Sequence, residues 1–507
     1  MYSHSLQTIL SGEDNFLDYS RPMLKKNTLL LMLLCVFCSA SAANFLTFTA
    51  EENGSSFEIV CKGDCNPDLH ISMDGGKRWT FLAEGDVITM GKGDKVLLKG
   101  NNPLGISKDW YNYMRFVMTG SIAASGSVMS LIDGKGENKV VPNDYCFCKL
   151  FERCTSLTQA PELPATGLTT NCYSHMFYGC TGLTQAPALP ALRLANGCYY
   201  EMFAKCANLT QSPALSATIL ATDCCRSMFA GCTRLTQAPA LPATTLAEEC
   251  YAQMFDSCTS LTQAPELPAT KLAMACYRGM FSSCLNLTQA PELPAKSLAL
   301  ACYHEMFYNC IGLKQAPALP ATELSGGCYE AMFALCLNLT QAPELPATGL
   351  AMECYEHMFS KCTSLTQAPA LPATSLTEKC YAGMFSYCTN LTQAPELPAT
   401  RLATDCYKGM FVDCANLSQA PHLPAPKLVK GCYMEMFSHC TKLSSITVNF
   451  TDWGMQFGNG DDARNWNTEG WLSGISPNGT FICPKVLPKE FSDNKIPENW
   501  KVERAKK

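Results

Sequence analysis

The middle of this chain repeats one 26-residue unit twelve times, without an insertion or a deletion. A fixed period of this length is typical of a solenoid, in which each unit buries its apolar face against its neighbours. We therefore expect the chain to work through an extended surface and not through a single catalytic pocket. The first cysteine of each unit marks the register, at Cys146, Cys172, Cys198, Cys224, Cys250, Cys276, Cys302, Cys328, Cys354, Cys380, Cys406 and Cys432.

Each unit begins with a short extended half, such as Leu157–Leu163 with the sequence LTQAPEL. Proline has no N–H to donate to a sheet ladder, so the repeated prolines limit strand pairing. Only two or three residues in each unit, around Thr158 to Ala160, are expected to pair with the next unit. Twelve parallel strands about 4.8 Å apart would give a ladder of roughly 55 Å.

The second half of each unit carries apolar residues four positions apart, which is the spacing along one ridge of an α-helix. The sequence therefore predicts a helix of about three turns in each unit, and an α/β solenoid of twelve strand-turn-helix units. The predicted structural core of the second unit consists of Cys172, Met176, Phe177, Cys180 and Leu183.

The recurring run Met-Phe-x-x-Cys-x-x-Leu-x-x-Ala-Pro-x-Leu-Pro resembles the BspA-like leucine-rich repeats of bacterial surface proteins. In the second unit the matching positions are Met176, Phe177, Cys180, Leu183 and Ala186, and the resemblance covers about residues 144–450. Two features depart from the family pattern: the unit is 26 residues long, and an Ala-Pro pair replaces a β-branched strand core. The resemblance implies a secreted or surface-exposed protein of a host-associated bacterium, with roles in adhesion and in binding host proteins.

Composition changes at both ends of the array, because all six tryptophans lie outside the repeats. Short alternating runs between turn clusters predict a small β-sandwich domain over residues 43–143. The leucine-rich-repeat-like solenoid is expected over 144–444 and a C-terminal capping region over 445–507, with a hairpin signal at Asn478-Gly479. Since a solenoid exposes an apolar face at each end, both flanks are expected to act at least partly as caps.

The N-terminus predicts secretion. Residues 23–42 combine two lysines, an apolar stretch from Leu29 to Phe37 and the small residues Ala40-Ser41-Ala42, which is the pattern of a signal peptide. Residues 1–22 then represent a possible over-long start. The apolar stretch is too short for a comfortable membrane span, and no membrane span is expected in the mature chain.

The 31 cysteines raise the question of disulfides. On a helix, cysteines eight residues apart are separated by about 12 Å, whereas a disulfide needs Cα atoms within roughly 7 Å. We therefore interpret the repeat cysteines as small apolar packing residues. Cys61 and Cys65 lie in a turn-rich stretch and can pair locally, a question that the sequence leaves open.

Residue types with catalytic or ligating chemistry form no recognisable pattern. The chain has 38 basic and 44 acidic residues without a basic block, so nucleic acid is not an expected partner. No metalloprotease, phosphate-binding or nucleophile-elbow motif occurs. Cys146, Cys148 and Cys154 superficially suggest a metal site, but no histidine lies nearby and two of them are repeat cysteines. We expect no enzymatic activity, no cofactor and no metal.

Thr-Gln-Ala-Pro recurs almost unchanged on the strand side of the units, whereas positions of the second half vary. Two groups of residues are therefore candidate binding sites. One is the repeated Thr-Gln ladder, represented by Thr158, Gln159, Thr184 and Gln185. The other is the tryptophans of the C-terminal region, Trp466 and Trp471. The variable side is a further alternative.

The leading hypothesis is a non-enzymatic secreted or cell-surface bacterial protein on the extracellular side of the envelope. It would bind an extracellular or host surface protein or glycan through an extended, multivalent surface. One alternative is a structural spacer of the cell envelope. Another is a glycan-binding protein that uses the Trp-rich C-terminal region.

Overall fold

The computed structural model describes residues 44–454 and 467–505. The predicted over-long start and signal peptide therefore lie outside the described residues, as does Trp466. Contacts join these described residues into one compact unit. The boundaries expected at residues 143 and 444 consequently stay predictions. No helix among the described residues is long and apolar enough to cross a membrane.

The N-terminal residues form two sheets. One has the strand order β4-β3-β6-β1-β8-β9 and the other has the order β5-β2-β7. Every pairing among the first eight strands is antiparallel. The strands are β1 (Leu46–Ala50), β2 (Ser55–Lys62), β3 (Leu69–Ser72), β4 (Thr80–Phe81), β5 (Ile88–Met90), β6 (Lys95–Gly100), β7 (Tyr113–Thr119) and β8 (Ile122–Ser125).

Alternation of side chains places one face of each longer strand in a shared core. In β1, and in β2 as far as Ile59, every second residue is buried, as expected for half-buried strands. Phe48 of the first sheet packs edge-on against Phe57 and Phe116 of the second, with ring centroids 4.9 and 5.0 Å apart. The short helix α2 (Ser130–Asp133) lies beside β6.

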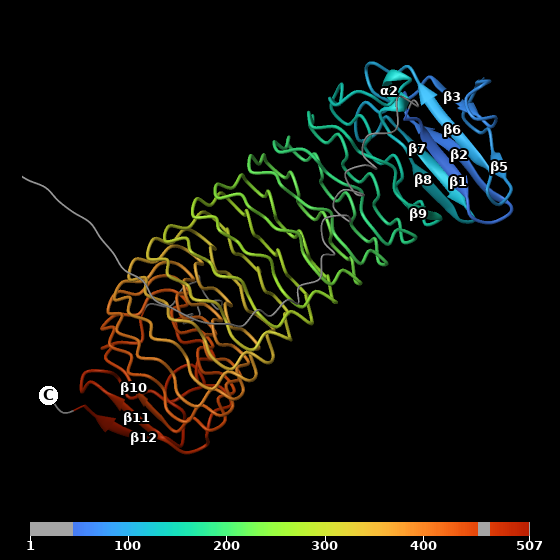
Figure 1. The fold of residues 1–507 in the computed structure, drawn as a ribbon. Coiled ribbons are helices and arrows are strands. Elements are labelled where there is room, and N and C mark those ends of the chain that lie inside the picture. Colours follow the sequence, from blue (N-terminus) through green and yellow to red (C-terminus); the bar gives the residue numbers. More distant parts are fainter. Residues whose placement is uncertain (1–43, 455–466, 506–507) are drawn as a thin grey trace, which may run out of the picture. The chain divides into compact units, whose positions relative to one another are not determined.

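The twelve repeats form stacked coils in sequence order, as Figure 1 shows. Only the first coil contains a regular strand, β9 (Leu157–Gln159), which pairs in parallel with β8. Between later coils the pairing shrinks to single bridges such as Gln185 with Gln211 and Gln367 with Gln393. The prolines thus restrict strand pairing even more than the sequence predicted.

The prediction of a helix in the second half of each unit is wrong. Residues 172–180 form a series of overlapping turns, and the same is true in the other coils. The backbone amides of Ser174, Met176 and Tyr178 each donate a hydrogen bond to the carbonyl oxygen three residues earlier, with an N···O distance of 3.1 Å. The intervening amides of Tyr173, His175 and Phe177 instead donate to carbonyl oxygens of the next coil, at 3.1, 2.9 and 2.9 Å. An α-helix would keep all of these bonds within itself.

Left-handed backbone makes this arrangement possible. Three residues in each coil, spaced four apart, have a positive φ, for example Asn171, His175 and Gly179 with φ of 52°, 55° and 69°. A positive φ at the third residue of a turn reverses the chain, which a right-handed helix cannot do. Among the described residues, every non-glycine residue with a positive φ lies in the coils.

The turns point side chains alternately inward and outward in adjacent pairs. Cys172, Tyr173, Met176 and Phe177 are buried, whereas His175 and Tyr178 are partly exposed. Equivalent phenylalanines stack along the array, with centroids 5.7 Å apart for Phe229 on Phe255. The period of four therefore reflects a turn pair and not a helical ridge, while the predicted packing role of these side chains agrees with their burial.

The two flanks complete the hydrogen bonding of the terminal coils. At the start, Ser107 and Phe116 of the N-terminal part donate their amides to the carbonyl oxygens of Cys146 and Leu150, at 3.2 and 2.8 Å. At the end, amides of the last coil donate to residues 467–473, including Phe437 to the carbonyl oxygen of Trp471 at 2.9 Å. Both flanks thus satisfy backbone groups that an open end of the stack would leave unpaired.

The strand side of the array continues into a C-terminal sheet, β10 (Ser445–Thr447), β11 (Thr480–Cys483) and β12 (Lys501–Arg504). Its pairings are all parallel. The hairpin predicted at Asn478-Gly479 is therefore wrong, since Gly479 leads into a strand with two parallel neighbours. A side chain at Gly479 would collide with the Trp500 ring, because a Cβ there would lie 2.6 Å from it.

Candidate binding surfaces

Every coil presents two surfaces to solvent. The strand-side surface consists of the Thr-Gln positions, such as Thr184 and Gln185, which are both exposed. The turn-side surface consists of the outward positions of the turns, such as His175, Tyr178 and Gly179 and their equivalents in the other coils. The residues at equivalent positions are nearly constant on the strand side and change from coil to coil on the turn side.

Threonines of the strand-side surface also hold neighbouring coils together. The Thr210 hydroxyl donates to the carbonyl oxygen of Thr184 at 3.1 Å, and Thr288 donates in the same way to Thr262 at 3.2 Å. Thr158, in the first coil, donates to the Glu51 carboxylate at 2.9 Å. Of the predicted binding residues, Thr158 therefore already bonds within the chain through its side chain and Thr184 through its carbonyl group, and Gln159 lies exposed at the end of β9.

Shallow polar hollows open on the strand side where consecutive coils lack a bridge. One of about 420 Å³ lies between the eighth and ninth coils, and another of about 490 Å³ lies between the tenth and eleventh. They are lined by Thr340, Gln341, Ala342, Thr366, Gln367, Ala368 and Pro369, and by Thr392, Gln393, Ala394, Ser418, Gln419, Ala420 and Pro421.

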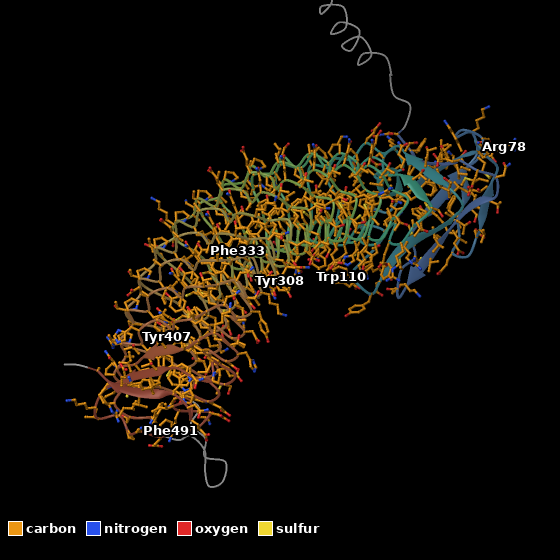
Figure 2. The ribbon with its side chains drawn as sticks, turned by 90° about the horizontal axis from the view of Figure 1, so that it is seen from below. Arg78, Trp110, Tyr308, Phe333, Tyr407 and Phe491 are labelled. Carbon is orange, nitrogen blue, oxygen red and sulfur yellow. The ribbon has the colours of Figure 1, made fainter. Side chains whose placement is uncertain are left out.

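The turn side carries a concentration of aromatic rings that the sequence pattern does not predict. We call Trp110, Tyr145, His175, Tyr178 and Tyr200 the Trp110 cluster. The Trp110 ring packs edge-on against His175 and Tyr200, with centroids 5.1 and 6.2 Å apart. All five side chains are partly exposed. Figure 2 places Trp110 and Tyr308 along one edge of the coils, with Phe333 further inside.

Cations surround the Trp110 cluster. The Lys149 ammonium lies 5.0 Å from the Trp110 ring centroid, and the Lys205 ammonium lies 5.2 Å from that of Tyr178. The Arg226 guanidinium lies 5.8 Å from the Tyr200 centroid. Tyrosine, tryptophan and arginine are the residues enriched at the energetic centres of protein interfaces. The cluster therefore has the composition of a protein-binding surface.

A partly exposed histidine–glutamate pair fixes part of this surface. The His175 Nε2 and Glu201 Oε2 atoms are 3.2 Å apart. Burial opposes ionisation of Glu201, but the hydrogen bond and charge of His175, together with a bond from Tyr200, lower the pKa of that carboxyl overall. The pair orients the imidazole among the aromatic rings, because a charged partner restricts the rotamers of both groups.

The sequence model of the BspA type leucine rich repeat region, which holds six copies of the repeat, matches residues 144–262, 277–418 and 352–454. The chain belongs to the BspA type leucine-rich repeat family. Repeats of this family generally serve protein interaction and not catalysis, and members are typically cell-surface or secreted bacterial proteins. No curated protein and no solved structure matches the chain.

The leucine-rich repeat core contains the five predicted core residues, each with 0% exposure: Cys172, Met176, Phe177, Cys180 and Leu183. From the second repeat onward, the second cysteine of each repeat donates its thiol hydrogen to a backbone carbonyl of the preceding coil, as Cys206 does to Phe177 at 3.1 Å. Burial raises the pKa of Cys206 to about 12, which keeps the thiol protonated. All described cysteines are free thiols.

The predicted aromatic site at the C-terminal end of this repeat protein is not a surface feature where it is described. Trp471 has 0% exposure and packs against Tyr433, Trp453 and Phe481. Its indole N–H donates to the carbonyl oxygen of Lys495 at 3.0 Å. The ring therefore covers the last coil. Within the described ranges, no three acidic, histidine or cysteine side chains are placed to hold a metal ion.

The residues that vary from repeat to repeat point toward the turn side, but their variation alone does not identify a binding site. Trp110 lies between β6 and β7, far from the repeats in sequence, so nothing in the repeat pattern links it to His175. Only the docking of the N-terminal sheets on the first coil brings these residues together.

Proposed function

We propose that this protein is a secreted or cell-surface bacterial adhesion protein that binds host or extracellular proteins through its turn-side surface. The Trp110 cluster is the observation that supports this choice most directly. Its rings are partly exposed and cations lie over them, which gives a partner both apolar area and charge-assisted hydrogen bonds. The turn side also offers different side chains in each coil, as a surface for extended recognition requires.

Binding to extracellular matrix proteins tests the proposal. We would immobilise collagen, laminin and fibronectin in turn and measure association of the full mature chain. A double variant, Tyr200→Ala with Arg226→Ala, removes two members of the turn-side surface near Trp110. We expect at least a tenfold loss of affinity, which is about 1.4 kcal/mol, for any partner that the unmodified chain binds.

The matched control changes the strand side of neighbouring coils, with Gln237→Ala and Gln263→Ala. These two substitutions should leave affinity unchanged. Equal losses in both double variants would contradict a turn-side site. Circular dichroism and thermal melting of each variant separate loss of binding from loss of folding.

A structural spacer of the cell envelope is the second candidate. The near-identity of the coils supports it, since each coil bonds to its neighbours in the same way. Deleting four internal repeats separates the two functions. A spacer would keep its activity at reduced reach, whereas a multivalent binder would lose avidity. The deletion should leave the Trp110 cluster intact if it begins after the fifth coil.

A further inference from the structure

A hollow of about 400 Å³ lies on the turn-side surface of the ninth to twelfth coils, well separated in sequence from the Trp110 cluster. Its volume falls within the range of small-ligand sites. Two glycines, Gly383 and Gly409, occupy the central left-handed position of consecutive coils, where the coils above and below carry His357 and Glu435. The missing side chains create the hollow.

The two glycines have different consequences. A Cβ at Gly383 would lie 2.2 Å from the His357 ring, so the imidazole occupies the space that a side chain would fill. A Cβ at Gly409 would meet only the Val412 side chain, at 3.4 Å. The His357 imidazole thus lies over Gly383 and forms one side of the hollow, and the space over Gly409 is open.

The rim combines hydrogen-bond acceptors and donors with one aromatic ring. Asp405 and Glu435 supply carboxylates, and Lys408 supplies an ammonium group. Tyr387 is 44% exposed and adds apolar ring surface. Charges of the two signs nearly balance around the hollow, which disfavours a phosphorylated ligand and a metal cation alike.

Glu356 adds to the rim a carboxyl group that is partly protonated near neutral pH. Burial raises the pKa of this carboxyl to about 7, against the opposing effect of Lys379. Near neutral pH the carboxyl therefore exists in both protonation states, and it can donate as well as accept a hydrogen bond. Such a group suits a ligand whose own hydroxyls do both.

We propose that this hollow binds one neutral pyranose residue of a glycan. A sugar ring carries adjacent hydroxyls that donate and accept at once, which matches the mixed rim, and its C–H face packs on an aromatic ring such as Tyr387. The hollow shares no residue with the Trp110 cluster, and the proposal does not rest on the proposed protein-binding function.

Saturation-transfer NMR on the full mature chain tests this inference. The probes are the methyl glycosides of glucose, galactose, mannose and N-acetylglucosamine, with N-acetylneuraminic acid as an acidic comparison. We expect at least one neutral glycoside to receive saturation from the protein. Absence of a signal from all four, or a signal from the acidic sugar alone, would overturn the proposal.

A variant that fills the hollow locates the binding. Gly409→Gln introduces the residue that Gln253 already provides at the equivalent left-handed position, where φ is 54°. The coil should therefore accept it, and binding should fall at least tenfold. Gly279→Gln makes the same change in the sixth coil, outside the hollow, and should leave the signal unchanged. Equal signals in both variants would place the sugar elsewhere and reject this site.

The aromatic contribution has its own pair of variants. Tyr387→Phe keeps the ring and should retain most of the saturation transfer, whereas Tyr387→Ala should lose it. Matrix-protein binding at the Trp110 cluster, which lies in other coils, should be unaffected by Gly409→Gln. Failure of the sugar site and failure of the proposed protein-binding function therefore give different results.

Discussion

The thiol of Cys206 donates a hydrogen bond to the carbonyl oxygen of Phe177 in the preceding coil, across 3.1 Å. The equivalent cysteine makes the same kind of bond in every coil, and in the first coil the acceptor is Phe116 of β7. The first cysteine of the unit lies farther from an acceptor, as Cys198 does at 3.9 Å from the carbonyl oxygen of Cys224. The two cysteines of a unit therefore contribute differently to stability.

Replacing Cys206 with alanine should destabilise the adjoining coils by about 2 kcal/mol, because the change removes a buried thiol and one of the two hydrogen bonds that the Phe177 carbonyl oxygen accepts. Cys198→Ala removes the same atoms from an equally buried position and should cost less, since its bond is long. Native-state hydrogen exchange of the second and third coils measures both. Equal losses would show that packing alone, and not the thiol bond, matters.

Ala331 is held at a φ of 50° and is only partly buried. Ala331→Gly should raise stability by roughly 0.5–1 kcal/mol, because glycine adopts left-handed backbone without a Cβ clash. Ala331→Val should lower stability, because β-branched residues are the least tolerant of a positive φ. Urea midpoints of the two variants should move in opposite directions. A change in the same direction would contradict the strained-turn interpretation.

The described cysteines should react with iodoacetamide according to their burial. Cys61 and Cys65 are half-buried and all the others described are buried. Burial, and then the charge of Cys61, raises the pKa of Cys65 to about 12, so even this pair should react slowly. Peptide mass spectrometry should find modification confined to Cys61 and Cys65 in the native chain and spread over all described cysteines in guanidinium. A disulfide between repeat cysteines would contradict this expectation.

The protonation of Glu356 should make stability depend on pH. Burial raises the pKa of this carboxyl from an ordinary 4.5 to about 7 in the folded chain. Between these values the folded state binds a proton that the unfolded state has lost, so its contribution to stability falls as pH rises. The charged groups that also act on its pKa are Lys379, Glu330, Glu353 and Lys408.

Glu356→Gln removes this titration and should flatten the pH dependence. Melting temperatures of the variant and the unmodified chain, compared between pH 5 and pH 8, measure the difference. The variant should gain relative stability as pH rises. A difference between the two proteins that stays constant with pH would contradict the raised pKa.

The sequence predicted the repeat register and the limited strand pairing, because prolines act locally and the period is visible along the chain. The helix that the sequence predicted in the second half of the unit is wrong, because this half forms a series of turns. Residues such as Cys172, Met176 and Cys180 lie on one side of a helix and on one side of a turn series alike, so their spacing cannot distinguish the two.

One signal could have separated these folds. Glycine recurs at three fixed phases of the unit, as in Gly179, Gly197 and Gly279, and those phases never hold valine, isoleucine or threonine. Repeated glycine is unfavourable inside a helix and favourable at left-handed positions. The Trp110 cluster offered no comparable signal, because its members come from two regions that only tertiary packing brings together.

The turn amides that link successive coils donate toward the next coil, and only the two end coils bond to a different kind of partner. Recombination between near-identical gene segments can insert or remove whole units. Such a change would leave the hydrogen bonds of the first and last coils to the flanking segments unchanged. Copy number can vary between lineages without a new interface having to evolve. The length of the array is thus a quantity that selection can adjust in steps of one repeat.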